Sequence, residues 1–281
     1  MCRIAIFLGS AEKFRELYNS LIKSFIEVSE YDWIFEEYTK GKEKSHSDGW
    51  GFLGITIEDK RIIHYRSITP FYKDKLDILN GWVESTEGDI AFLLHVRAGS
   101  PNMAKNIFSV HPMYVEAPSG SQIYLIHNGT LFKEPLAKLV GDTTDNPRYA
   151  MYNDTYYAGK IIADMKVFSM SKLQSLLEIF SHPKYLYSAF NFGLIWLSSK
   201  TSYMVVGPIY RTAKGRELVE YYRLFKVEDK EYDLYLSSTN KEWLEENGYK
   251  WGFEEVVNGF ITVYPDFRLD DAVGFQLPRI L

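Results

Sequence analysis

The first half of the chain alternates short apolar runs with one long amphipathic segment. Residues 2–8 are almost all apolar and stop at Gly9-Ser10, which predicts a buried strand. Between residues 12 and 28 the apolar side chains recur every three or four positions, as in a helix with one buried face. Further strands are predicted at 51–57, 61–67, 90–96, 113–116 and 122–127, with a polar loop at 40–48 and a helix around 73–82.

The second half opens with two helical segments, 154–165 and 172–180, and then returns to strands. Asn153 or Asp154 and Ser171 are the expected N-caps of these helices. The later elements are strands at 188–198, 203–210, 221–227, 232–238 and 260–263, and a short helix at 240–247. Strands, then helices, then strands again favour antiparallel sheets with segregated helices, an α+β fold. Without an internal repeat or a linker, residues 1–281 are expected to form one domain.

Composition narrows the classes of function. The 281 residues carry a formal net charge of −5 and no run of Lys and Arg, which argues against a nucleic-acid partner. A single cysteine excludes an intrachain disulfide and a multi-thiolate metal site, and it suits a reducing compartment. No stretch reaches the roughly 18 apolar residues of a membrane span, and the start does not have the pattern of a signal peptide. We therefore expect a cytoplasmic protein with no membrane partner.

The single cysteine is the second residue, Cys2, directly after Met1. If Met1 is removed, one residue carries both a thiol and a free α-amine, and an amine that titrates near neutral pH can act as base for the thiol. This is the chemistry of an N-terminal nucleophile. Alternatively, Cys2 is only a small apolar residue that opens a buried strand, and its position alone does not decide between the two.

Two glycine-containing segments combine polar groups with the end of a strand. In Asp48-Gly49-Trp50-Gly51 the glycines allow close backbone approach, although alone the segment predicts an ordinary hairpin entrance. Arg97 ends the apolar strand before Gly99, and its planar guanidinium suits a carboxylate, with the hydroxyl of Ser100 three residues on. For an isolated arginine, a structural salt bridge is the alternative.

Two further positions have a structural and a chemical interpretation. Asn128-Gly129 follows a predicted strand and would ordinarily form a type I′ turn. The Asn amide and the Gly backbone N–H can instead point together at an oxyanion, as an acyl-transfer site requires. Asp154 can cap a helix, bind an ammonium group, or do both.

Taken in order, these motifs resemble a known family. They are Met1-Cys2-Arg3, Asp48-Gly49-Trp50-Gly51, His95-Val96-Arg97, His111-Pro112, His127-Asn128-Gly129 and Asn153-Asp154-Thr155. The set resembles the class II glutamine amidotransferase domain, the N-terminal cysteine branch of the Ntn-hydrolase superfamily. The opening Cys-Arg and the Asp-Gly-Trp-Gly motif are most similar to free-standing members, including the amidohydrolase of ergothioneine biosynthesis. They are less similar to the fused domains of glucosamine-6-phosphate synthase and amidophosphoribosyltransferase.

The resemblance implies a four-layer α/β/β/α sandwich and a set of roles. By this resemblance Cys2 is the nucleophile, with its α-amine as base, and the oxyanion hole is formed by Asn128 (side chain) and Gly129 (backbone). The substrate α-carboxylate is held by Arg97 and Ser100, and the α-ammonium by Asp154. A candidate site loop is formed by Asp48, Gly49, Trp50 and Gly51. Two positions depart from the family pattern. Pro101 replaces a frequent histidine and Tyr156 a frequent acidic residue, and neither concerns the acyl-transfer step.

The implied reaction is hydrolysis of a γ-glutamyl amide without metal or cofactor, which leaves His46, His95, His111 and His127 as structural residues. Glutamine is the expected substrate, with ammonia passed to a synthetase partner on another chain. Two alternatives stay open: a stand-alone hydrolase for a larger γ-glutamyl compound, and a degenerate binding module without turnover. Residues 30–47 and 69–87 are expected to flank the site.

Overall fold

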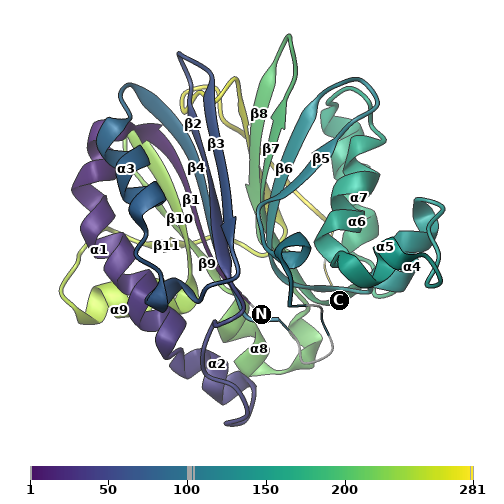
Figure 1. The fold of residues 1–281 in the computed structure, drawn as a ribbon, viewed down its shortest axis with the longest axis horizontal. Coiled ribbons are helices and arrows are strands. Elements are labelled where there is room, and N and C mark those ends of the chain that lie inside the picture. Colours follow the sequence, from purple (N-terminus) through teal and green to yellow (C-terminus); the bar gives the residue numbers. More distant parts are fainter. Residues whose placement is uncertain (1, 100–102, 104, 279, 281) are drawn as a thin grey trace.

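Two antiparallel sheets lie face to face in the computed structural model, which describes residues 2–99, 103, 105–278 and 280. Helices cover the outer face of each sheet, so the layers run helix, sheet, sheet, helix (Figure 1). The predicted α+β, four-layer architecture is therefore confirmed. In the described part of the chain, every helix is too short or too polar to cross a membrane.

Sheet A has the strand that begins at Cys2 near its middle. In spatial order it contains β11 (Glu254–Glu255), β9 (Leu224–Glu228), β10 (Tyr232–Ser237), β1 (Cys2–Ser10), β4 (Asp89–Arg97), β2 (Trp50–Thr56) and β3 (Arg61–Ser67). Side chains alternate along β1. Ile4, Ile6 and Leu8 face sheet B, whereas Ala5 and Phe7 pack under the helices of the outer layer.

Sheet B contributes the second half of the core between the sheets. Its spatial order is β13 (Val273–Gln276), β12 (Phe260–Pro265), β8 (Ser202–Gly207), β7 (Leu186–Leu197), β6 (Gln122–Leu131) and β5 (Met113–Glu116). Tyr124, Ile126 and Ile195 face sheet A, and the alternate residues of the same strands, such as Ile123 and Leu125, face the helices outside.

The helices fall into two groups, one for each sheet. Against sheet A lie α1 (Ala11–Glu30), α3 (Asp77–Ser85) and α9 (Ser238–Glu246); on the side of sheet B lie α4 (Lys133–Leu139), α5 (Pro147–Met151), α6 (Asp154–Ala163) and α7 (Met170–Ser181). At the end of the molecule where β1 starts, α2 (Trp33–Tyr38) packs against α8 (Arg216–Tyr222) (Figure 1). Short 3-10 helices occupy Phe71–Lys73, Ile107–Ser109 and Thr212–Lys214.

Some sequence predictions of local structure are wrong, and some short helices were not predicted. The predicted strand 221–227 starts late, because Tyr221 and Tyr222 end α8 and the strand covers 224–228. The N-cap of α7 is Ser169, not Ser171, because the helix begins earlier than the apolar pattern indicated. Short helices α2, α4, α5 and α8 were not predicted, since each is too brief to show a helical period.

Candidate active site

Cys2 lies at the start of β1, between the two sheets, and only 6% of it is exposed. It stands directly opposite Arg97 in the antiparallel ladder, so the two side chains share one face of sheet A. The backbone N–H of Cys2 donates to Oδ1 of Asn128 in sheet B at 3.0 Å. The Tyr221 hydroxyl donates to the Cys2 carbonyl at 3.3 Å. Residues from β1, β4, β6 and α8 therefore meet at the only thiol of the sequence.

Asn128-Gly129 does not form the type I′ turn that the dipeptide predicts, because it lies inside β6. Gly129 has φ +140°, the strand shifts register between Gly129 and Leu131, and a Cβ at this glycine would collide with the carbonyl of Ala189. Because the Cys2 nitrogen can only donate, Asn128 Oδ1 must face it. Asn128 Nδ2 is thereby left as a donor directed away from that nitrogen.

Arg97 is 2% exposed, and several backbone contacts help to fix its position. Its N–H donates to the Gly49 carbonyl at 2.9 Å, its carbonyl accepts from Asp48 N–H at 3.0 Å, and Nη1 donates to the Asp48 carbonyl at 3.4 Å. The guanidinium lies over Gly99, where a Cβ would be 2.7 Å from Nη2. This close packing holds the guanidinium on the same face as Cys2.

The Asp48–Gly51 motif acts on the site through this backbone. Asp48 Oδ2 accepts from Gly99 N–H at 2.8 Å, and Oδ1 pairs with Lys105 at 2.7 Å. Gly49 has φ +102°, a conformation that favours glycine. Trp50 points the other way, into the outer core of sheet A, where its indole N–H donates to Asp74 at 2.9 Å. The motif therefore shapes the segment that presents Arg97.

Asp154 joins the start of α6 to the segment that follows Gly129. Its Oδ2 accepts from Leu131 N–H at 2.7 Å and its Oδ1 from Thr155 N–H at 3.0 Å. Asn153 is the N-cap, with Oδ1 accepting from Tyr156 N–H at 3.1 Å, which leaves Asp154 with further acceptor capacity. The remaining predicted residue, Ser100, lies outside the described residues.

Three buried histidines hold the strand segment that carries Asn128. His127 Nε2 donates to the Ala189 carbonyl at 3.0 Å, so in the neutral ring Nδ1 accepts from the Thr155 hydroxyl, also at 3.0 Å. That hydroxyl accepts from His111 Nε2 at 2.7 Å, and His95 Nε2 donates to the His127 carbonyl at 3.1 Å. Burial lowers the pKa of all three and brings that of His95 to about 3. The network therefore positions Asn128 with neutral imidazoles.

Asn191 is one residue that the sequence did not single out. It pairs with Asn128 across β6 and β7, and its Oδ1 accepts from Ile209 N–H at 3.2 Å. Its Nδ2 donates to the Tyr222 carbonyl at 2.5 Å. A buried asparagine in an apolar strand, as in Phe190-Asn191-Phe192, is the signal that marks it.

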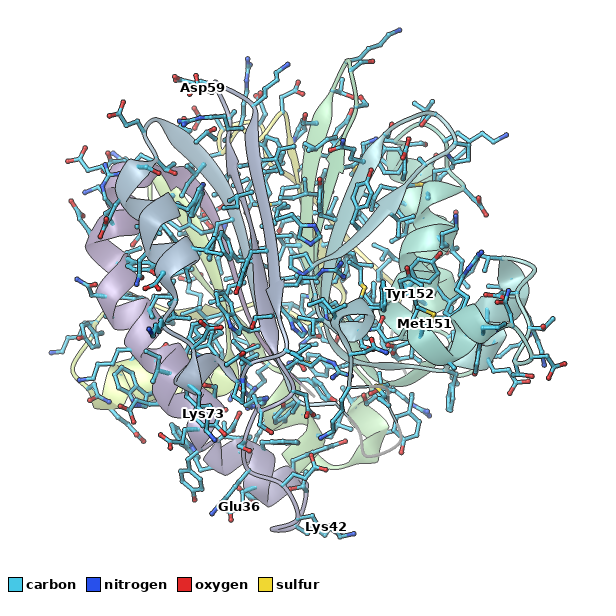
Figure 2. The ribbon with its side chains drawn as sticks, viewed as in Figure 1. Glu36, Lys42, Asp59, Lys73, Met151 and Tyr152 are labelled. Carbon is cyan, nitrogen blue, oxygen red and sulfur yellow. The ribbon has the colours of Figure 1, made fainter. Side chains whose placement is uncertain are left out.

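An open cavity of about 560 Å³ adjoins Asp48 and Gly99. It is lined mostly by residues of the segment 36–48, including Glu36 in α2 and Lys42 in the loop that follows it (Figure 2). That residues 30–47 flank the site stays a prediction; the structure places part of this segment beside Asp48 and Gly99. Residues 77–85 form α3, whose Leu79 and Val83 pack in the outer core, so that part of the prediction is wrong. Among the described residues there is no cluster of three or more His, Cys, Asp or Glu able to hold a metal ion.

No family model matches the sequence. The curated proteins likewise include no match. Solved structures do match: the allosteric regulatory enzyme of purine biosynthesis has a TM-score of 0.60 and 13% identity, over 98% of this chain and 49% of that one. Glutamine phosphoribosylpyrophosphate amidotransferase from B. subtilis has a TM-score of 0.56 and 11% identity, with the same coverage of 98% and 49%. The chain has the fold of a class II glutamine amidotransferase domain.

The resemblance seen in the motifs is thus confirmed at the level of the fold. The chain spans about half the length of these two amidotransferase structures. A glutamine aminotransferase class-II domain protein from Silicibacter pomeroyi also matches, with a TM-score of 0.49 and 13% identity over 99% of this chain and 100% of that one.

Proposed function

We propose that this chain is a glutamine amidotransferase that hydrolyses the γ-amide of glutamine through a thioester on Cys2. The supporting observation is the meeting of Cys2 with Asn128 at 3.0 Å across the sheets and with Arg97 directly opposite in the ladder. The reaction requires that Met1 is removed, because only then does Cys2 carry a free α-amine. The nitrogen that now donates to Asn128 would then be that amine.

In this mechanism the Cys2 α-amine takes the thiol proton and Sγ attacks the γ-carbonyl carbon of glutamine. Negative charge develops on the carbonyl oxygen, and Asn128 Nδ2 and the Gly129 N–H donate to it. The protonated amine gives its proton to the leaving nitrogen, so ammonia departs and a γ-glutamyl thioester remains. Water, deprotonated by the same amine, attacks the thioester and releases glutamate and the thiol.

The α-groups of glutamine supply the orientation. Arg97, with Ser100, holds the α-carboxylate through its planar fork of donors, and Asp154 accepts from the α-ammonium. The buried position of Arg97 and Asp154 makes both contacts strong, since little water competes for them. Residues 1–281 act as one amidotransferase domain in this proposal, and the ammonia acceptor is a synthetase on another chain.

Labelling with 6-diazo-5-oxo-norleucine, a glutamine analogue that alkylates the nucleophile, tests the proposal. We expect one adduct per chain, on Cys2 of protein whose Met1 has been removed, together with glutamate release from glutamine. Cys2→Ala should show neither, while retaining the wild-type melting temperature. A chain that begins at Cys2 but forms no adduct and releases no glutamate would refute the glutaminase assignment. A peptide fused before Cys2 should abolish both signals, and a C-terminal fusion should not.

A further inference from the structure

Arg3, the residue after the nucleophile, carries a dense set of contacts on the opposite face of β1. It is 1% exposed. Its Nε pairs with Asp32 at 2.5 Å, Nη2 donates to the Thr239 hydroxyl, and Nη1 donates to the Tyr221 carbonyl at 3.2 Å. The guanidinium also lies over the Tyr221 ring, 4.1 Å from its centre. Residues far apart in sequence thus converge on one side chain at the start of the chain.

Asp32 is held as tightly as the arginine. Oδ1 accepts from Phe35 N–H and from the Thr239 hydroxyl, each at 2.9 Å, and Oδ2 faces His46 Nε2 at 2.8 Å. Burial alone would raise the Asp32 pKa, but the Arg3 charge and the His46 hydrogen bond outweigh it and lower that pKa. Burial lowers the pKa of His46, so Arg3 and Asp32 are the charged members and cancel each other.

This ionic cluster is connected directly to the nucleophile. The Tyr221 carbonyl accepts a hydrogen bond from Arg3 Nη1, and the Tyr221 ring packs against the Arg3 guanidinium. The Tyr221 hydroxyl donates to the Cys2 carbonyl. One residue along the chain, the backbone N–H of Ile4 donates to the Ser237 hydroxyl at 2.9 Å. The peptide groups before and after Arg3 are therefore both held by side-chain hydrogen bonds.

The first residues of a domain are poorly ordered unless something ties them down. For a nucleophile at the chain start this matters, because an error of about 1 Å in its position can cost about 100-fold in rate. We propose that Arg3 is a positioning residue whose buried pairing with Asp32 and Thr239 holds Cys2 in its reactive place. The proposal rests on the function proposed above, and it assigns Arg3 a role in kcat in addition to any role in stability.

Arg3→Lys tests the role, because lysine keeps the charge but loses the forked set of donors. We expect kcat for glutamate release, per Cys2 titrated with the diazo analogue, to fall about 10- to 100-fold at temperatures well below unfolding. KM should stay within about threefold of the wild-type value, because Arg97 and Asp154 bind the substrate from other elements. Tyr264→Phe is the matched control.

That control removes buried hydrogen bonds to Asp233 and Tyr235 at the far end of β1, where Asp233 pairs with Leu8. It should lower the melting temperature and leave kcat unchanged. Folded Arg3→Lys with a normal kcat would overturn the proposal. If Arg3→Lys does not fold, Thr239→Val decides by the same criterion: a kcat at least threefold below wild type supports it, and an unchanged kcat refutes it. Wild-type protein that is neither labelled nor active would instead refute the proposed function.

Discussion

The two ends of the layer between the sheets are built from the same strands but from opposite kinds of residue. At the far end, Ile6, Leu8 and Leu93 from sheet A pack against Ile195 and other apolar side chains of sheet B. At the near end, sheet A presents Cys2, His95 and Arg97, and sheet B presents Asn128 and Asn191. Along the inner face of β1, for example, the side chains change from Ile6 and Ile4 to Cys2.

This difference separates stability from chemistry. Apolar burial gives roughly 25 cal/mol per Å² removed from water, so the far end holds the sheets at a fixed distance. Burial of polar groups costs free energy unless each one is hydrogen-bonded, and at the near end backbone carbonyls accept from His95 Nε2, Arg97 and Asn191. Substitutions at the two ends should therefore affect different observables.

Asn128→Asp should have the largest effect of these substitutions, and it should lower kcat rather than stability. Aspartate keeps an acceptor for the Cys2 nitrogen but replaces Nδ2 with negative charge, which repels the developing oxyanion. Losing one oxyanion donor costs about 10²–10³ in kcat, and the repulsion should bring the loss to about 10³ or more. KM should change far less, and so should the melting temperature. A wild-type kcat would remove Asn128 from the oxyanion hole.

Arg97→Lys should come next, with kcat/KM for glutamine reduced about 30- to 100-fold, or about 2–3 kcal/mol. Lysine retains the charge, but it cannot hold a carboxylate with two parallel hydrogen bonds. Steady-state kinetics and urea unfolding would show whether activity falls without comparable loss of stability. Arg66→Lys, on the edge strand β3, which β2 separates from β4, is the control and should be kinetically normal. Unfolding of Arg97→Lys, or normal kinetics, would favour a purely structural role for Arg97.

His95→Gln should reduce the pH dependence of stability. Because burial lowers the His95 pKa to about 3, the unfolded chain, with an ordinary histidine pKa of about 6.5, binds a proton that the folded protein does not. The free energy of unfolding should therefore decrease as the pH falls below 6.5. Between pH 6.5 and 5, wild type should lose about 1.5 kcal/mol more than the glutamine variant in urea titrations. Equal losses would mean that His95 is protonated in the folded state.

Ile6→Val tests the far end with the smallest change. It removes the Cδ1 methyl, which packs across the layer over Gly193 of β7. The expected cost is about 1 kcal/mol in the free energy of unfolding, measured in urea, with kcat and KM unchanged. A loss of kcat in this variant would show that the two ends of the layer are coupled.

The sequence predicted the layers well because most strands have an uninterrupted apolar run or a clear alternation. It ended the predicted strand 122–127 before Asn128-Gly129, although β6 continues to Leu131, and the reason is specific. The dipeptide is a strong local turn signal, but the conformation is decided by Ala189 of β7, sixty residues further along, whose carbonyl leaves no room for a side chain at Gly129. The contact with Ala189 therefore overrides the turn preference of the dipeptide.

The sequence could also list site residues without showing how they are held. That Cys2 pairs with Arg97 follows from the register of β1 and β4, which the order of the motifs does not contain. In the sequence, Arg3 stands out only as part of the motif Met1-Cys2-Arg3. Its partner Asp32 lies in a segment with no recognisable pattern. Buried ion pairs between distant segments leave no periodic signal, so only the folded arrangement reveals them.

The interior position of β1 in sheet A has a consequence for the order of events during synthesis. Its two neighbours are β4 and β10, and β10 comes more than 220 residues after β1 begins. A ribosome therefore releases β1 long before one of its two neighbours. Until residues 232–237 emerge, one edge of the apolar strand β1 stays unpaired and can pair with strands of other chains. Chains truncated before β10 should therefore aggregate with their cysteine exposed, and the thiol becomes enclosed only when that late strand pairs with β1.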